Sequence, residues 1–235
     1  MNRLEIHKKI SEQLEKQLHN FFIDVDMSEI DEKIEEAYGR CLNAIAASND
    51  RYLSFNGTPR FLLDHSGCWS LFLYYLSNSL KNVSKGKGAT KVYYLNKILH
   101  GVDWFYEVQL PEHFMTDHPV GSVLGRAEYG DFLFVYQGVT IGGNISLKSS
   151  QWVYPVLGNN IILFSNATVL GEAYIGNNVI FSANSYVINE DIPDDSIVFG
   201  SSPNLIVKYE PEKVREYMGI LWKGNRTGGG TCIPI

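Results

Sequence analysis

The chain has 235 residues and a formal net charge of −6, with 45% hydrophobic and 20% charged residues. That length supports one large domain or two small ones, and the composition is typical of globular proteins and excludes disordered or fibrous ones. The acidic balance argues against nucleic-acid binding, which usually requires a basic face. No apolar run approaches the ~20 residues that cross a bilayer, and residues 1–16 lack the apolar stretch of a signal peptide. We therefore expect a cytoplasmic protein that binds neither nucleic acid nor a membrane.

The cysteines are few, odd in number and widely spaced: Cys41, Cys68 and Cys232. They form neither a metal-ligand pattern nor a disulfide framework. We expect unpaired thiols and no metal site.

The first hundred residues have the apolar spacing of helices. We predict one helix over residues 1–22 and a second that opens at Asp26 or Ser28 and ends at Asn49. Thr58-Pro59 predicts the start of a third helix, because a threonine cap followed by proline is a common helix start. This helix should stop near Lys81, and a fourth is expected over residues 89–100, closed by Gly101.

From Val102 the helical period disappears and a six-residue period replaces it. One column contains only aliphatic or aromatic residues, and a second column, four residues later in each turn, contains mostly small or β-branched ones. A repeat this short cannot bury its own apolar face, so successive turns must stack into a solenoid. The first column consists of Leu157, Leu163, Val169, Ile175, Phe181 and Val187, and Tyr129, Val135 and Ile141 keep the same step earlier in the chain.

We therefore predict an α+β protein with three parts. A helical domain (residues 1–101) is followed by a left-handed parallel β-helix of triangular section (102–209) and by a short C-terminal helix with a flexible tail (210–235). A β-sandwich with accidental spacing is the alternative, and the unbroken register of the first column argues against it.

Several short stretches resemble the hexapeptide-repeat serine acetyltransferases. Val102-Asp103 is followed, without a gap relative to the family, by Met115-Thr116-Asp117-His118. Val139-Thr140-Ile141-Gly142-Gly143 resembles the Val-Thr-Leu-Gly-Gly turn of the family, and Gly200-Ser201-Ser202-Pro203 resembles its Gly-Val-Pro exit from the β-helix. The resemblance runs from about Asp50 to Val207.

The resemblance implies a reaction and a catalytic pair. Transfer of an acetyl group from a thioester to a hydroxyl needs a base for the hydroxyl proton, and histidine suits this task near neutral pH. His118 is the implied base, and Asp103 is the carboxylate that orients its ring. The backbone N–H groups of Gly142 and Gly143 are the implied donors to the oxyanion. Alternatively, Asp103 caps a turn and the two glycines only turn the chain.

The implied acceptor site is only partly preserved. Asp50 and Asp117 match the two acidic residues that hold the amino group of serine in the family. The family binds the serine carboxylate with an Arg-His pair, whereas this chain has Val153-Tyr154 before Pro155, which leaves Tyr154 as the lining residue there. A second family histidine is replaced by Phe105. Either another group binds the carboxylate or the acceptor is not free serine; the candidates for such a group are Arg60, Lys148 and Gln151.

The donor implied by the resemblance is acetyl-CoA, held largely by main-chain groups along a groove between neighbouring subunits. This carries over to Gly142, Gly143, Ser165 and Ala183. The family also implies homotrimers, or dimers of trimers. A glycine run that precedes the terminal Ile235 resembles tails that insert into O-acetylserine sulfhydrylase, although a tail that ends on an apolar residue by chance is the alternative.

Three functions remain open. The first is serine O-acetyltransferase activity, which makes O-acetyl-L-serine for cysteine biosynthesis. The second is the same chemistry on another hydroxyl acceptor, such as an amino alcohol, a modified amino acid or a sugar. The third is a non-catalytic binding or scaffold protein that keeps the fold, against which the joint presence of Asp103 and His118 argues.

Overall fold

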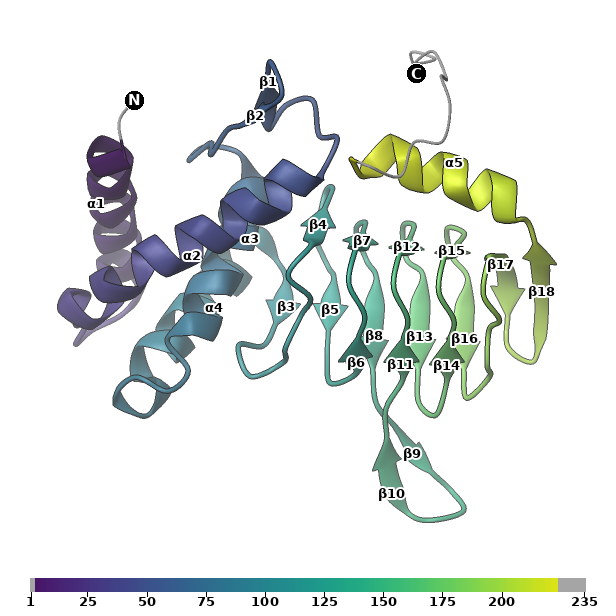
Figure 1. Cartoon of the computed structure of the whole chain (residues 1–235). Coiled ribbons are helices and arrows are strands. Elements are labelled where there is room, and N and C mark those ends of the chain that lie inside the picture. The colour runs from purple at the N-terminus through teal and green to yellow at the C-terminus, as the bar shows by residue number, and fades with distance from the viewer. Residues whose placement is uncertain (1–2, 224–235) are drawn as a thin grey trace.

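The computed structural model of the chain describes residues 3–223, and the tail with Ile235 and Cys232 lies outside this range. Four helices form the N-terminal part (Figure 1), and their apolar residues point into a common core. Asp26 caps the second helix by accepting a hydrogen bond from the backbone N–H of Ser28, which satisfies one of the free donors at a helix start. The helices are α1 (Arg3–Phe21), α2 (Met27–Ala47), α3 (Ser66–Ser79) and α4 (Lys87–His100).

The predicted start of the third helix at Thr58-Pro59 is wrong. Residues Thr58–Pro59 form strand β2, which pairs antiparallel with β1 (Ser54–Phe55). Asn56 and Gly57 connect the two strands with positive φ angles of 49° and 76°, a conformation that favours an Asn-Gly dipeptide in a tight hairpin. The hairpin outweighs the helix-start signal, and α3 begins only after His65, whose ring caps it by accepting from the N–H of Cys68.

The fourth helix ends where the sequence predicted, but it starts earlier than predicted. Residues Ser84–Gly86 form a short 3-10 turn, so α4 begins two residues earlier than expected, at Lys87. Gly101 closes it with a φ of 65° and donates its N–H to the carbonyl of Lys97. A left-handed residue after the last turn is a common helix end, and glycine adopts it without a steric penalty.

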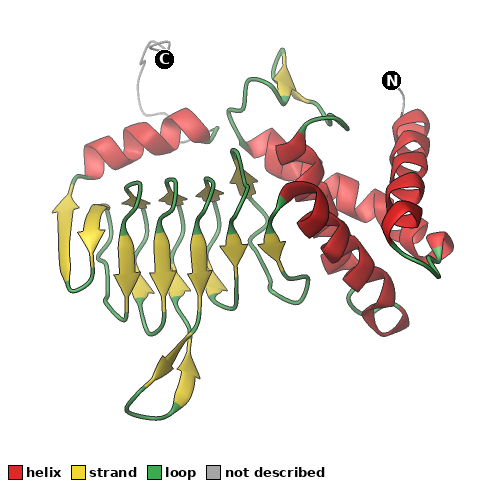
Figure 2. Ribbon diagram, turned by 180° about the vertical axis from the view of Figure 1, so that it is seen from behind, coloured by secondary structure: helices red, strands yellow, loops and turns green. Residues whose placement is uncertain are grey.

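The predicted β-helix is present as a parallel β-solenoid, the arrangement of hexapeptide-repeat β-helix proteins (Figures 1 and 2). Short strands on three faces pair with the strands one turn before and after them, and the six residues of the predicted column are all buried. The first face contains β4 (Phe114–Thr116), β7 (Leu133–Val135), β12 (Ile161–Leu163) and β15 (Val179–Phe181). The second contains β3 (Asp103–Trp104), β5 (Val123–Leu124), β8 (Thr140–Gly142), β13 (Thr168–Leu170) and β16 (Tyr186–Ile188). The third contains β6 (Glu128–Tyr129), β11 (Val156–Leu157) and β14 (Tyr174–Ile175).

The chain turns from face to face at three edges, which we name by their contents. The histidine edge joins the first face to the second and comprises residues 117–122, 136–139, 164–167 and 182–185. The hairpin edge joins the second face to the third and comprises residues 125–127, 143–155, 171–173 and 189–191. The third edge, residues 113, 130–132, 158–160, 176–178 and 194–195, returns the chain to the first face. Asparagines occupy many of the turns because they tolerate the positive φ angles there.

Two hairpins interrupt the regular turns. The first, β9 (Asn144–Ser146) paired with β10 (Gln151–Val153), projects from the hairpin edge. The second, β17 (Ser196–Ser201) paired with β18 (Asn204–Tyr209), closes the C-terminal end of the solenoid. The sequence indicated an excursion at residues 144–154 but no strands within it, because its apolar residues are largely exposed and follow no period that predicts burial.

Helix α5 (Pro211–Leu221) confirms the predicted C-terminal helix and runs back along the solenoid, on the side opposite the β9–β10 hairpin (Figures 1 and 2). The buried Trp222 behind it packs edge-on against Phe132 and Phe134. The backbone N–H of Asn49 donates to the carbonyl of Leu221 at 2.8 Å. Helix α5 thus covers the first face and ties it to the end of α2.

The predicted part boundaries coincide with changes of secondary structure, since α4 ends at His100 and β18 ends at Tyr209. Their status as separate domains stays a prediction. Cys41 and Cys68 are buried free thiols, as expected. None of the helices within residues 3–223 combines the length and the apolar character needed to cross a membrane.

Candidate functional site

His118 projects from the histidine edge of the solenoid. Its side chain is 78% exposed, and its Nε2 lies 3.5 Å from an Asp117 carboxylate oxygen. The neighbouring Thr116 and Pro119 are buried, and the Thr116 hydroxyl donates to the carbonyl of Val135 at 3.0 Å. His118 itself has a φ of 49°, in the sparsely populated region where strained functional residues are often found. The fold therefore anchors the backbone on both sides and leaves the ring free to meet a ligand.

Asp103 lies beside the same edge, one turn earlier. The segment from Gly101 to Asp103 runs alongside the edge: Gly121 N–H donates to the Gly101 carbonyl at 2.9 Å and Asp103 N–H donates to the Ser122 carbonyl at 2.8 Å. Within residues 3–223, however, no hydrogen bond or ion pair joins Asp103 to His118. Asp103 and His118, the expected catalytic pair, thus lie near the same edge but are not bonded to each other.

The Asp103 carboxylate is held by two residues of α4 that the sequence analysis missed. The Tyr93 hydroxyl donates to one oxygen at 2.6 Å and the Lys97 ammonium group to the other at 2.5 Å. Burial works to raise the pKa of Asp103, but the hydrogen bonds from Lys97 and Tyr93 outweigh it, so its pKa lies below the ordinary value. Tyr93 and Lys97 are four residues apart on a helix and therefore share a face, a signal that was visible before the structure.

The predicted donor-site residues Ser165 and Ala183 also lie on the histidine edge. Ser165 is half-buried and Ala183 is exposed, and the carbonyl of Ser165 accepts the N–H of Asn184 at 2.9 Å. Beside Ala183 is a cavity of about 390 Å³ between the end of the solenoid and α5. Its walls carry aromatic rings and two lysines: Phe164, Phe199, Tyr217, Lys208 and Lys213.

Gly143 and Tyr154 lie on a different edge, the hairpin edge, and Gly142 directly precedes it in the chain. Gly142 ends β8 and is buried, and Gly143 follows it beneath the Tyr154 ring. A Cβ atom on Gly143 would lie 2.7 Å from Tyr154 Cε1 and 3.1 Å from Trp152 Cε3. Only glycine therefore fits under the ring without displacing it. Sequence reasoning missed Arg126. Its guanidinium lies over the ring of Tyr154, the predicted lining residue, 5.5 Å from the ring centroid.

Asp50 sits at the end of α2 and is engaged locally. One carboxylate oxygen accepts the backbone N–H groups of Tyr52 at 2.7 Å and Leu53 at 3.2 Å. No hydrogen bond or ion pair of the described residues joins Asp50 to Asp117 or either of them to Tyr154. The structure thus distributes the expected acceptor residues over the helical part, the histidine edge and the hairpin edge.

The three expected replacements for the carboxylate anchor are also dispersed. Arg60 lies over the ring of Phe55, 6.0 Å from its centroid, at the β1–β2 hairpin. Gln151 pairs with Ser146 in the β9–β10 hairpin, and Lys148 lies exposed in the turn between those strands.

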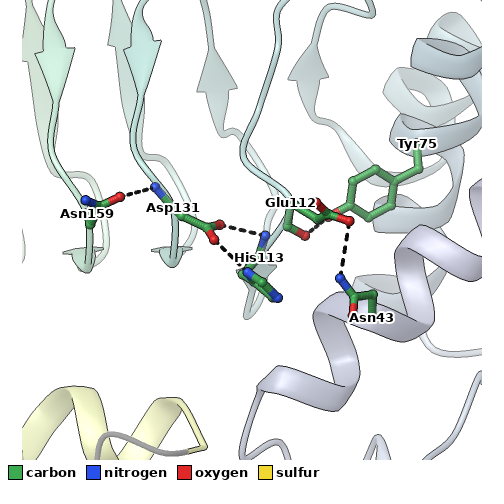
Figure 3. A network of polar contacts seen from close by, with 6 residues as sticks. All are labelled: Asn43, Tyr75, Glu112, His113, Asp131 and Asn159. Carbon is green, nitrogen blue, oxygen red and sulfur yellow. Dashed lines mark hydrogen bonds and ion pairs between the residues drawn. The ribbon is translucent and has the colours of Figure 1, made fainter.

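His113 contrasts with His118, because its ring is bound within the chain (Figure 3). Its Nδ1 lies 2.7 Å from an Asp131 carboxylate oxygen, and its backbone N–H donates to the other oxygen at 2.9 Å. The ring also stacks on Phe132, with centroids 4.6 Å apart. Asp131 N–H in turn donates to the Asn159 side chain. These contacts tie successive turns of the third edge together, so His113 has a structural role there.

His100 is likewise satisfied. It is bound to Asn96 Oδ1 at 2.8 Å, and burial lowers its pKa to about 4. Within residues 3–223, no three His, Cys, Asp or Glu side chains converge in a way that would hold a metal ion.

Comparisons with known proteins point to one enzyme family. No model of a known protein family matches the chain. A serine acetyltransferase from Synechococcus elongatus is 37% identical over 83 residues, which cover 35% of this chain and 33% of that protein. One from Synechocystis is 32% identical over 115 residues, 48% of this chain and 45% of that protein. One from Staphylococcus aureus is 28% identical over 119 residues, 50% of this chain and 55% of that protein. The chain thus spans between a third and about half of the length of these relatives.

Solved structures extend the likeness to most of the fold. The serine acetyltransferase of Brucella abortus superimposes with a TM-score of 0.67 at 18% identity, over 87% of this chain and 84% of that one. The Neisseria gonorrhoeae enzyme in complex with serine gives a TM-score of 0.60 at 22% identity, over 77% of this chain and 74% of that one. At this identity the likeness establishes the shared fold of helices and β-solenoid.

Proposed function

We propose that this protein is an acetyl-CoA-dependent O-acetyltransferase whose acceptor is L-serine. The observation that carries the proposal is His118, exposed and held with a positive φ on the edge of a solenoid whose sequence is similar to serine acetyltransferases. The repeated left-handed position of this edge is occupied by Gly121, Gly138, Asn166 and Asn184. His118 lies outside this repeat, so the solenoid itself needs no histidine there.

In the proposed reaction, His118 accepts the proton of the serine hydroxyl while the hydroxyl oxygen attacks the thioester carbonyl carbon. The backbone N–H groups of Gly142 and Gly143 donate to the oxyanion of the tetrahedral intermediate. The carbon–sulfur bond then breaks, the proton on His118 passes to the departing thiolate, and O-acetylserine and CoA result. Asp103, ionised and fixed by Tyr93 and Lys97, is the proposed carboxylate partner of the charged imidazole. In this role the exposed His118 ring must turn toward Asp103 when the substrates bind.

The division of the site residues over two edges supports an assembly in which copies share a site. His118, Ser165 and Ala183 lie on the histidine edge, whereas Gly143 and Tyr154 lie on the hairpin edge, which Gly142 directly precedes. A trimer that sets the histidine edge of one copy against the hairpin edge of the next brings both groups together. The donor would lie in the groove between them.

A second acceptor class is favoured by one observation: Val153-Tyr154 stands where serine acetyltransferases have their carboxylate anchor. Amino alcohols, modified amino acids and sugars are the candidates. The association with O-acetylserine sulfhydrylase through Ile235 and the cytoplasmic location stay predictions.

The test is thiol release from acetyl-CoA with a panel of acceptors, in which L-serine is compared with ethanolamine, homoserine and simple sugars. Saturable thiol release with L-serine, together with O-acetylserine in the product, supports the proposal. Turnover with ethanolamine and none with L-serine would transfer the chemistry to a carboxylate-free acceptor. No transfer to any acceptor would indicate a binding or scaffold protein.

A further inference from the structure

Arg126 has no carboxylate partner among residues 3–223. It follows Gly125 at the hairpin edge, and its side chain is exposed. Its guanidinium lies over the face of the Tyr154 ring, 5.5 Å from the ring centroid, and no acidic side chain within residues 3–223 forms an ion pair with it. A guanidinium over an aromatic ring presents its N–H groups in one plane, and this fork matches the geometry of a planar anion such as a carboxylate.

Arg126 lies next to residues of the predicted reaction site, namely Gly142, Gly143 and Tyr154. Gly125 N–H donates to the Ile141 carbonyl at 2.7 Å, and a Cβ atom on Gly125 would lie 3.5 Å from Gly142 Cα. The backbone before Arg126 therefore packs directly on β8, which ends at Gly142, the first of the two glycines proposed as oxyanion donors. The Tyr154 ring, which Arg126 covers, rests on Gly143. Arg126, Tyr154 and Gly143 thus form one cluster.

We propose that Arg126 binds the carboxylate of the acceptor and makes the enzyme specific for an amino-acid acceptor. This inference rests on the proposed function. Arg126 of one copy holds the carboxylate of the serine whose hydroxyl meets His118 of a neighbouring copy. Binding through two parallel N–H···O contacts is the strong and directional form of guanidinium–carboxylate recognition, and Tyr154 supports the guanidinium from behind.

The other cations are less well placed for this role. Arg60 lies on Phe55 in the β1–β2 hairpin, within the helical part of the chain. Lys148 lies exposed in the turn of the β9–β10 hairpin, and a flexible ammonium group offers no planar pair of donors. Arg126 alone among these cations is fixed against the predicted lining residue Tyr154.

The experiment is steady-state kinetics of full-length Arg126→Met, with L-serine and ethanolamine as acceptors. We expect the KM for L-serine to rise about 10- to 100-fold, the usual loss for a charge-assisted hydrogen-bonded contact. The KM values for ethanolamine and acetyl-CoA should not change, and Arg126→Lys should recover part of the affinity for L-serine. Arg215→Met is the matched control, because it removes an exposed arginine of α5 on the opposite side of the solenoid, and it should match the wild type.

Three results would overturn the proposal. An unchanged KM for L-serine would exclude Arg126 from acceptor binding. A raised KM for acetyl-CoA alone would show that Arg126 binds a phosphate of the donor. Equal losses with L-serine and ethanolamine would mean that it supports the site without reading the carboxylate. If the wild-type enzyme transfers acetyl groups to no acceptor, the proposed function fails first, so the two failures are distinguishable.

Mixed oligomers test the placement of Arg126 across copies. His118→Ala and Arg126→Met chains are co-expressed with different tags, and oligomers that carry both tags are purified. If each site takes His118 from one copy and Arg126 from its neighbour, some sites are complete, and activity with the wild-type KM for L-serine returns. If it does not return, the proposed sharing between copies is wrong.

Discussion

His113 and His118 lie on either side of strand β4, at two different edges of the solenoid. The two side chains differ in their contacts and in their exposure to solvent. The third edge surrounds His113 with a carboxylate at 2.7 Å and a stacked phenylalanine ring, and leaves its side chain 24% exposed. The histidine edge leaves His118 78% exposed beside its sequence neighbour Asp117. A histidine that stabilises the fold finds its partners within the chain, whereas one that serves a reaction must leave room for a ligand.

The sharpest test of this comparison is removal of each ring. His118→Ala should lower the rate of acetyl transfer about 10²- to 10⁴-fold, the usual worth of a general base, and should leave stability near that of the wild type. His113→Ala should keep turnover and lose about 1 kcal/mol of folding free energy with its hydrogen bonds. Thiol release and urea unfolding measure the two effects. Comparable turnover of the two variants would contradict the assignment of His118 to catalysis and of His113 to the fold.

Replacement of Asp103 tests whether it acts together with His118 as a catalytic pair. Asp103→Asn keeps the shape of the side chain but removes the charge that stabilises the imidazolium, so kcat should fall by about 10- to 10⁴-fold. The lower bound is usual for partners of metal-binding histidines and the upper for the aspartate of a catalytic triad. The KM for acetyl-CoA should stay constant, because Asp103 does not contact the donor in the proposed site. A collapse of donor affinity, with kcat preserved, would instead assign Asp103 to the structure of the turn.

Glycine replacements compare the hairpin edge with the helical part. In Gly143→Ala the new methyl group meets the Tyr154 ring at 2.7 Å, so we expect a loss of about 1–3 kcal/mol, typical of overpacking, and weaker turnover. Gly39→Ala is the matched control within α2, where a Cβ meets nothing within 4 Å. It should stabilise the protein by about 0.5–1 kcal/mol. Equal stabilities of both variants by urea unfolding would show that Tyr154 moves aside freely.

The smallest expected effect concerns the pH dependence of the third edge. Burial works to raise the pKa of Asp131, but the hydrogen bonds from the ring and backbone of His113 outweigh it and hold this pKa below the ordinary value. The ionised carboxylate therefore stabilises the fold above about pH 4, the usual value for an aspartate. This contribution is lost as the pH falls through the lower pKa of the folded state.

Asp131→Asn should therefore show a shallower loss of stability on acidification below about pH 4 than the wild type. Urea unfolding at a series of pH values measures this slope. His113→Ala should reduce the slope in part, since it removes the ring donor but keeps the backbone N–H that also binds Asp131. If His113→Ala keeps the full wild-type slope, the cause lies elsewhere on the edge.

The sequence alone determined the solenoid, because its restraint is local and repeated. Each six-residue step must place one large apolar residue inside, and the buried column from Leu157 to Val187 confirms this. Helix ends with a strong local signal, such as the Asp26 cap and Gly101, were also predictable. Thr58-Pro59 was misread because two local signals competed, and the Asn56-Gly57 turn between pairing strands outweighed the threonine cap.

Only the tertiary structure decided how the candidate site is divided. The six-residue period shows which residues lie at turns, but it does not show which turns share an edge. The separation of His118 from Gly143 and Tyr154 therefore became visible only from the stacking of the three faces. The contacts of Tyr93 and Lys97 with Asp103, and of Arg126 with Tyr154, join residues from different elements. Long polar side chains reach such partners only after the elements have packed, and no local spacing encodes that distance.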